Sequence, residues 1–150
     1  MFIPIDIDKE SLPVKLGEAG FQKGKRSLFV LEGLLMYLQP ESVQKTFCTL
    51  RDFAGKESEA AFDYVYASVL RREELYEGKR QIVESVAKAG EGWHFGIERG
   101  EVEQFLSTYD LVLCAQCDAG QLEQMYFKDE SGKILGRVNG THCLVRAVKV

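Results

Sequence analysis

The sequence lacks the long apolar segments that membrane insertion or export would require. No apolar run among the 150 residues approaches the roughly 18 that a helix needs to cross a bilayer. The first ten residues, MFIPIDIDKE, contain neither the charged start nor the apolar centre of a signal peptide. These absences predict a cytoplasmic protein, in which the four cysteines are expected to be reduced thiols.

Clustered positive charge is also missing. Lysine and arginine number 19 against 23 acidic residues, which gives a net charge of −4 and an isoelectric point near 5.3. The densest basic stretch is Lys23 to Arg26, and no ladder of aromatic residues is interleaved with it. We therefore expect no binding to nucleic acid.

Several catalytic motifs are absent. The only histidines are His94 and His142, and no GxSxG or HExxH motif occurs, so a histidine-based nucleophile triad is not expected. The glycines before Lys25 do not form a phosphate loop, because Ala19 stands where the first glycine is required. The segment also precedes a predicted strand instead of following one.

Cysteine and histidine occur together near the carboxyl terminus, in a combination that zinc sites also use. Cys114 and Cys117 form the sequence CAQC, and His142 is followed by Cys143. However, CAQC lies in a strand-like run, where residues three apart point to opposite faces. We expect no bound metal and interpret these cysteines as buried, unreactive thiols.

The composition is that of a soluble globular protein, with 45% hydrophobic and 28% charged residues. No repeat or linker divides the chain, so residues 1–150 are predicted to form a single domain. Strand and helix patterns alternate and then end in a hairpin, which predicts an α/β fold with parallel strands and an antiparallel edge hairpin. The predicted strands cover 2–7, 27–31, 59–66, 111–117 and 141–150, the helices 10–19, 40–54, 69–89 and one from 98 or 100, and the hairpin arms 125–128 and 134–138.

The most informative segment is LFVLEGLLMYL, at residues 28–38, where a single carboxylate, Glu32, follows a short buried strand. Open α/β sheets bind ligands beyond the carboxyl ends of their strands, so Glu32 is the first candidate for a ligand site. Alternatively, its carboxylate accepts hydrogen bonds from the turn after the strand. Tyr37 lies five residues on, where its hydroxyl can reach a ligand or simply remain in solvent.

Asp6 is a second candidate, at the end of the predicted strand 2–7. A carboxylate there can accept hydrogen bonds from a ribose or an adenine amino group, while the backbone N–H of Ile7 meets a ring nitrogen. The alternative is that Asp6 or Asp8 caps the helix that follows.

An aromatic cluster precedes the helix predicted from residue 98 or 100. The segment WHFGI at residues 93–97 can wall a substrate pocket and offer His94 as a base. The alternative is a hydrophobic lid in which the histidine is incidental.

Taken in order, several segments resemble the leucine carboxyl methyltransferase family, and more closely its bacterial and archaeal branch of S-adenosylmethionine-dependent O-methyltransferases. They are PIDI, the helix ending in AGF, LFVLEGLLMYL, FDYVYASVL and FGIERGEVEQFL. The resemblance implies the C-terminal part of a class I (Rossmann-like) methyltransferase sheet. It also implies that Asp6, Ile7 and Glu32 bind S-adenosyl-L-methionine, and that Tyr37 is a catalytic candidate.

The family's glycine-rich first strand and its arginine, which hold the methionine end of the cofactor, have no counterpart in these 150 residues. We therefore expect either a partner polypeptide that supplies this N-terminal half or a homodimer. A homodimer would use the edge of strand 27–31, unless residues 2–7 fill that edge. The implied reaction is methyl transfer to a carboxylate or hydroxyl oxygen of an unidentified acceptor. The alternative is a non-catalytic ligand-binding or structural dimerisation domain derived from a methyltransferase.

Overall fold

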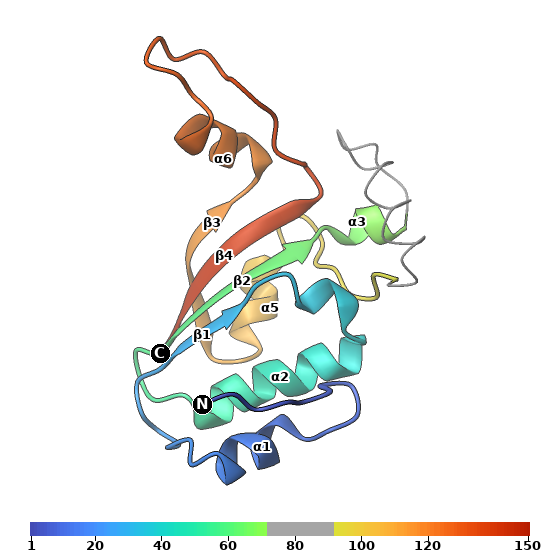
Figure 1. Cartoon of the computed structure of the whole chain (residues 1–150), viewed down its shortest axis with the longest axis vertical. Coiled ribbons are helices and arrows are strands. Elements are labelled where there is room, and N and C mark those ends of the chain that lie inside the picture. The colour runs from blue at the N-terminus through green and yellow to red at the C-terminus, as the bar shows by residue number, and fades with distance from the viewer. Residues whose placement is uncertain (72–91) are drawn as a thin grey trace.

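The protein is built on one four-stranded mixed sheet (Figure 1). The structure is a computed structural model that describes residues 1–71 and 92–150. The sheet order is β1-β2-β4-β3, with β1 parallel to β2 and with β4 antiparallel to both β2 and β3. The strands are β1 (Leu28–Leu31), β2 (Glu59–Val65), β3 (Leu111–Cys117) and β4 (His142–Lys149).

Helices connect the strands; in Figure 1, α2 and α1 lie beneath the sheet and α5 is seen behind β1 and β2. Helix α1 contacts α2, and Phe47 of α2 makes aromatic contacts with Phe62 of β2 and with Phe105 of α5. Helix α5 also contacts β3. The described helices are α1 (Leu12–Glu18), the 3₁₀ helix η1 (Leu35–Tyr37), α2 (Pro40–Phe53), α3 (Ala67–Leu70), α5 (Val102–Ser107) and α6 (Ala119–Tyr126).

The core lies between this helical layer and the sheet, and Phe47 of α2 is at its centre. The Phe47 side chain is fully buried. Its ring centroid lies 5.3 Å from that of Phe62 on β2, 4.8 Å from Phe105 on α5 and 5.3 Å from Tyr109. The α2 stripe predicted from the sequence therefore points at the sheet, and it fixes the position of β1 and β2 relative to the helices.

The opposite face of the sheet is open in the described part of the chain. Leu28 and Val30 of β1 are 67% and 59% exposed, and Leu144 of β4 is also exposed. Parallel strands are normally covered on both faces, because their connecting helices pack on both sides. The β1–β2 pair is therefore covered on one face only.

The predicted elements with strong hydrophobic patterns are confirmed, including β1, β2, β3, β4 and α2. The helix predicted at 10–19 forms as the shorter α1, and the one predicted from residue 98 or 100 forms as α5. Of the helix predicted at 69–89, the structure shows α3 at its beginning, and the remainder lies outside the described residues. No described helix is long and apolar enough to cross a membrane.

The strand predicted at residues 2–7 is wrong. Residues 1–6 have no regular structure, and a turn follows at 7–9. Pro4 has no N–H to donate to a ladder, Phe2 is 91% exposed, and Asp6 bonds within its own turn. This segment therefore does not pair with β1, which keeps a free edge in the described chain.

The antiparallel edge hairpin predicted at 125–138 is also not formed as a pair of strands. Asp118 and Gln121 exchange side-chain and backbone hydrogen bonds of 2.9 Å in a capping box, which starts α6. Only an isolated bridge, Lys128 with Ile134, remains of the hairpin. The antiparallel component is instead β4, which lies inside the sheet between β2 and β3.

Candidate functional site

The carboxyl end of β1 is shaped by a turn at Glu32 and Gly33. Gly33 has a φ of +59°, a conformation that favours glycine. Its N–H donates a 2.7 Å hydrogen bond to Oδ1 of Asp63 on β2. The Glu32 side chain is exposed and makes no hydrogen bond to any residue that the structure describes. Asp63 therefore holds the turn, and the carboxylate of Glu32 is available to a ligand.

Asp63 is the buried polar group that the sequence reasoning did not select. It is 9% exposed and stands on the open face beside the end of β1. The signal was present, since Asp63 is the only charged residue inside the otherwise apolar run AAFDYVY. A buried carboxylate in such a run needs a hydrogen-bond partner, and the N–H of Gly33 provides one.

His142 extends this polar cluster across the sheet. It opens β4, its Nδ1 lies 2.8 Å from Oγ1 of Thr141, and its ring meets the Trp93 ring edge-on at 5.4 Å. Burial lowers the pKa of His142, and the negative charge of Asp63 partly opposes that effect. His142 is thus held in its neutral form near the carboxyl end of β2.

The pKa of His142 predicts a pH dependence of stability. Because the folded-state pKa is lowered, the unfolded chain takes up the proton first, so the free energy of unfolding should fall as pH drops below about 6.5. We expect His142→Asn to flatten this dependence between about pH 7 and pH 5 in urea titrations. His94→Asn, which removes the other histidine, is the control. An unchanged pH profile in His142→Asn would contradict the assignment.

The indole N–H of Trp93 is buried and has no hydrogen-bond partner among the described residues. An unpaired buried donor costs roughly 1–3 kcal/mol, so such groups often serve a ligand or an ordered water. The segment around it is fixed, because the His94 N–H bonds Met36 O at 2.7 Å and the Ile97 N–H bonds Val65 O at 3.1 Å.

The two interpretations of the WHFGI segment can now be compared with its packing. Trp93 and Phe95 are partly buried and pack against the core cluster, as a hydrophobic lid would. His94 is exposed. The geometry therefore favours the hydrophobic lid, in which the indole N–H of Trp93 is a polar group that a ligand could use.

Asp6 sits in a local turn instead of at a strand end. Its Oδ2 pairs with Lys9 Nζ at 2.7 Å, and its Oδ1 accepts the Asp8 N–H at 3.2 Å. The hydrogen bond from Lys9 is the main cause of the lowered pKa of Asp6. These bonds resemble the capping alternative, although they stabilise the turn before α1 and not the helix itself.

The turn that carries Asp6 and Ile7 lies beside the block that carries Glu32 and Tyr37. Oδ1 of Asp8 accepts a 3.3 Å hydrogen bond from the N–H of Gln39, which follows η1. Tyr37, at the end of η1, is 36% exposed. Ile7 packs partly buried against the core, and its N–H makes no hydrogen bond to a described residue.

The hollow beside Glu32 is shallow. It has a volume of about 280 Å³ and is lined by Val30, Glu32, Ala61, Phe62, Asp63, Leu144 and Val145. Ligand sites usually exceed about 300 Å³ and bury most of the ligand. A larger groove of about 580 Å³ lies elsewhere, between residues 7–13 and the α2 residues 44–53. The hollow beside Glu32 is therefore slightly smaller than most ligand sites.

The cysteines do not gather with His142 into a cluster. Among residues 1–71 and 92–150, no group of three or more metal-ligating side chains converges. Cys114 is exposed, whereas Cys143 is buried, with its Sγ donating to the carbonyl of Cys117 at 3.4 Å. The absence of a bound metal stays a prediction.

Comparison with known proteins bears on the first third of the chain. The family model of the leucine carboxyl methyltransferases matches residues 1–51. Over these residues the chain is similar to that family. The matched segment contains Asp6, Ile7, Glu32 and Tyr37, so all four residues that the resemblance singled out lie within it.

Individual relatives are similar over limited parts of their length. A protein of Mycobacterium ulcerans (strain Agy99), provisionally named an S-adenosyl-L-methionine-dependent methyltransferase, is 34% identical over 62 residues, which are 41% of this chain and 21% of that protein. The chain therefore matches only about a fifth of the length of this relative.

Solved structures show the fold. A SAM-dependent methyltransferase from Methanosarcina mazei superimposes with a TM-score of 0.53 at 7% identity, covering 97% of this chain and 65% of that one. The magnesium protoporphyrin IX methyltransferase of Synechocystis PCC 6803, solved with bound SAH, gives 0.51 at 8% identity, with 100% and 51% covered. The α/β fold thus matches that of these solved methyltransferases, as predicted.

Proposed function

We propose that this chain is part of an S-adenosyl-L-methionine-dependent methyltransferase that transfers a methyl group to a carboxylate or hydroxyl oxygen. One observation carries the proposal. The segment matched by the methyltransferase family model contains the turn at Asp6 and Ile7 and the turn at Glu32, and a hydrogen bond from Gln39 to Asp8 holds the first turn against the end of the block that begins at Glu32. This arrangement lies at the carboxyl end of β1, where open sheets bind ligands.

The residues fit the adenosine part of the cofactor. The free N–H of Ile7 and the exposed carboxylate of Asp6 are suited to an adenine ring and its amino group. Asp6 would have to leave Lys9, but an exposed ion pair is worth only about 0–1 kcal/mol. The unpaired carboxylate of Glu32 can accept hydrogen bonds from ribose hydroxyls.

When bound, the cofactor supplies a methyl group on a positively charged sulfur. The contribution of this chain is then mainly to orient the reaction partners, since correct placement alone lowers the barrier of a two-substrate reaction substantially. Tyr37, the catalytic candidate, would position the acceptor oxygen with its hydroxyl. The lid at Trp93 would exclude water from the reacting groups.

We also propose that a further polypeptide completes the site. The hollow at Glu32 is too shallow to enclose a cofactor, and the open face of the sheet has exposed apolar side chains on β1 and β4. The chain covers 65% and 51% of the two solved methyltransferases, which supports an additional segment. The alternative, a non-catalytic ligand-binding or dimerisation domain, is favoured by the exposed β1 edge alone.

Binding of S-adenosylhomocysteine to the isolated chain tests the proposal. Because this chain would supply only part of the site, we expect a dissociation constant in the roughly millimolar range instead of the micromolar range. This corresponds to a loss of about 4 kcal/mol of binding free energy. Glu32→Gln should weaken binding about tenfold or more, because hydrogen bonds to charged groups contribute about 1.5–3 kcal/mol. Ligand-observed NMR can measure both constants.

Glu130→Gln is the matched control, because it makes the same change at an exposed loop position away from the site. Its affinity should equal that of the unmodified chain. Low-micromolar affinity of the isolated chain would contradict the proposal that this chain supplies only part of the site. An unchanged affinity in Glu32→Gln would contradict the role of that carboxylate.

A further inference from the structure

The edge strand β1 has unpaired backbone groups on its outer side. It is the terminal strand of the sheet, and no residue that the structure describes pairs with its outer edge. On the inner side, the Ser27 carbonyl accepts the Glu59 N–H at 2.9 Å. Because peptide groups alternate along a strand, those of Leu28 and Val30 point to the free edge. Such an edge is a template for another strand.

The side chains of this edge carry charges of opposite sign at its two ends. Arg26 precedes β1 and Glu32 follows it, and strand alternation places both on the open face with Leu28 and Val30. Along that face, the side chains from residue 26 to residue 32 are therefore positive, apolar, apolar and negative. An antiparallel second copy presents the same side chains in the opposite order, so that each charge faces a charge of opposite sign.

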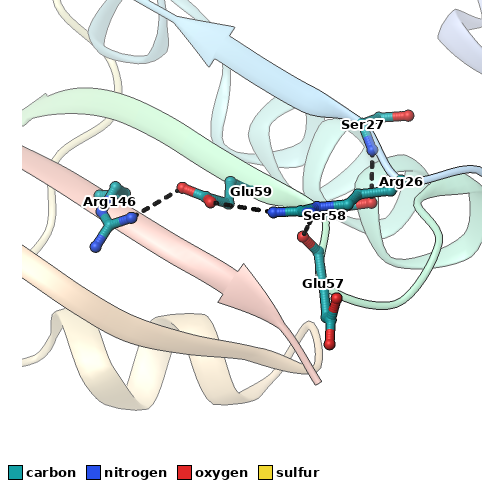
Figure 2. A network of polar contacts seen from close by, with 6 residues as sticks. All are labelled: Arg26, Ser27, Glu57, Ser58, Glu59 and Arg146. Atoms are coloured by element: carbon teal, nitrogen blue, oxygen red, sulfur yellow. Dashed lines mark hydrogen bonds and ion pairs between the residues drawn. The ribbon is translucent and has the colours of Figure 1, made fainter.

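Figure 2 shows how the positive end is held. Nε of Arg26 donates to the Glu57 carbonyl at 3.1 Å, and its terminal nitrogen lies 4.0 Å from Glu59. Glu59 has a closer partner in Arg146, at 3.1 Å. The side chain of Arg26 is 69% exposed, so its guanidinium can still bind another carboxylate.

We propose that two copies of this chain pair through β1, as antiparallel strands related by a twofold axis at Phe29. In this register Arg26 faces Glu32 of the second copy, and Leu28 faces its Val30. The pairs at Leu28 and Val30 are the hydrogen-bonded ones, since their peptide groups point outward. Cross-strand pairs of opposite charge and of apolar residues both stabilise a sheet.

The charges select this register over its neighbours. Moving one strand by two residues places Glu32 opposite Leu28, or Arg26 opposite Val30, and leaves both charges without partners. The segment 2–7 does not compete for the edge, because it lies elsewhere in the structure. A second copy of the chain is therefore the occupant that matches the edge in both charge and hydrogen bonding.

The dimer uses the Glu32 carboxylate for Arg26 of the second copy, so it competes with the ribose contact proposed above for the same carboxylate. It does not depend on the proposed methyltransferase activity, and it is tested without cofactor, by molecular mass. Arg26→Glu puts two acidic pairs into the dimer, and Glu32→Arg puts in two basic pairs. Each variant alone should dimerise roughly tenfold to a hundredfold more weakly than the unmodified chain. In a 1:1 mixture every pair is again of opposite sign, so a heterodimer should form with near-normal affinity. Sedimentation equilibrium of each sample gives these constants.

The mixture separates the interface from effects within one chain. Arg26→Glu also loses the contacts with Glu57 and Glu59, but these stay lost in the mixture, so recovery can come only from the second chain. Lys133→Glu, an exposed charge reversal on a distant loop, is the control and should leave dimerisation unchanged. Circular dichroism checks that each variant is folded.

A monomeric unmodified chain at about 100 µM, well above the micromolar dissociation constants of specific complexes, would overturn the proposal. So would variants that dimerise normally, or a mixture that stays monomeric. Leu28→Lys gives a second measure, since a lysine on an edge strand opposes pairing. It should abolish the dimer while changing neither end charge.

Discussion

Replacing Phe47 by alanine should lower the free energy of unfolding by about 3–5 kcal/mol, a large part of the stability of a domain of this size. The ring is fully buried and contacts Phe62, Phe105 and Tyr109. It therefore joins α2 to both β2 and α5. Its loss leaves a cavity at a point where two helices and the sheet meet.

Urea denaturation followed by circular dichroism measures the change. Phe127→Ala is the matched control, since Phe127 is 40% exposed and outside the core cluster. Phe127→Ala should lower the free energy of unfolding by less than about 1 kcal/mol. If both substitutions lower the free energy of unfolding equally, Phe47 is not at the centre of the core, and α2 does not pack on the sheet as described.

Gly96→Ala should have the second largest effect, because the new methyl group meets backbone and not flexible side chains. A Cβ at this position would lie 2.8 Å from Val65 O and 3.0 Å from Cα of Ala67. Residues 65–67 and 96–97 would have to separate, which breaks the bridge between Tyr66 and Ile97. We expect a loss of about 1–3 kcal/mol or more in the free energy of unfolding.

Gly92→Ala is the control for this substitution. Its Cβ would meet only the His94 ring, at 3.5 Å, which is ordinary contact. Because Gly96 also positions the Trp93 segment, Gly96→Ala should increase the fluorescence quenching of the single tryptophan by acrylamide. Equal stability and equal quenching in the two variants would show that the segment does not pack as the structure has it.

The parts of the fold that were predictable have short-range causes. The apolar runs at Leu28–Leu31, Glu59–Val65 and Leu111–Cys117 have the length of strands, and each forms one. Pro40 in the first turn and the apolar stripe behind it predicted α2 almost to the residue. The position of Glu32 at the end of a strand was likewise predictable, since a glycine directly after it indicates a turn.

The parts that were not predictable depend on contacts distant in sequence or on a competing local bond. Alternation at residues 2–7 resembles a strand, but Asp6 bonds its own turn instead, and the segment does not pair with the free edge of β1. The capping bonds of Asp118 with Gln121 override a strand-like run near Tyr126. The grouping of Asp63, His142 and Trp93 requires the sheet order β2-β4, which no local pattern reveals.

The most direct test of the proposed function is a crystal of this chain soaked in S-adenosylhomocysteine at a concentration above its expected millimolar affinity. The ligand should lie at the carboxyl end of β1, with its adenine against Asp6 and the N–H of Ile7 and its ribose within hydrogen-bond distance of Glu32. An empty site under these conditions, or a ligand that contacts neither Glu32 nor the turn at Asp6 and Ile7, would contradict the proposal.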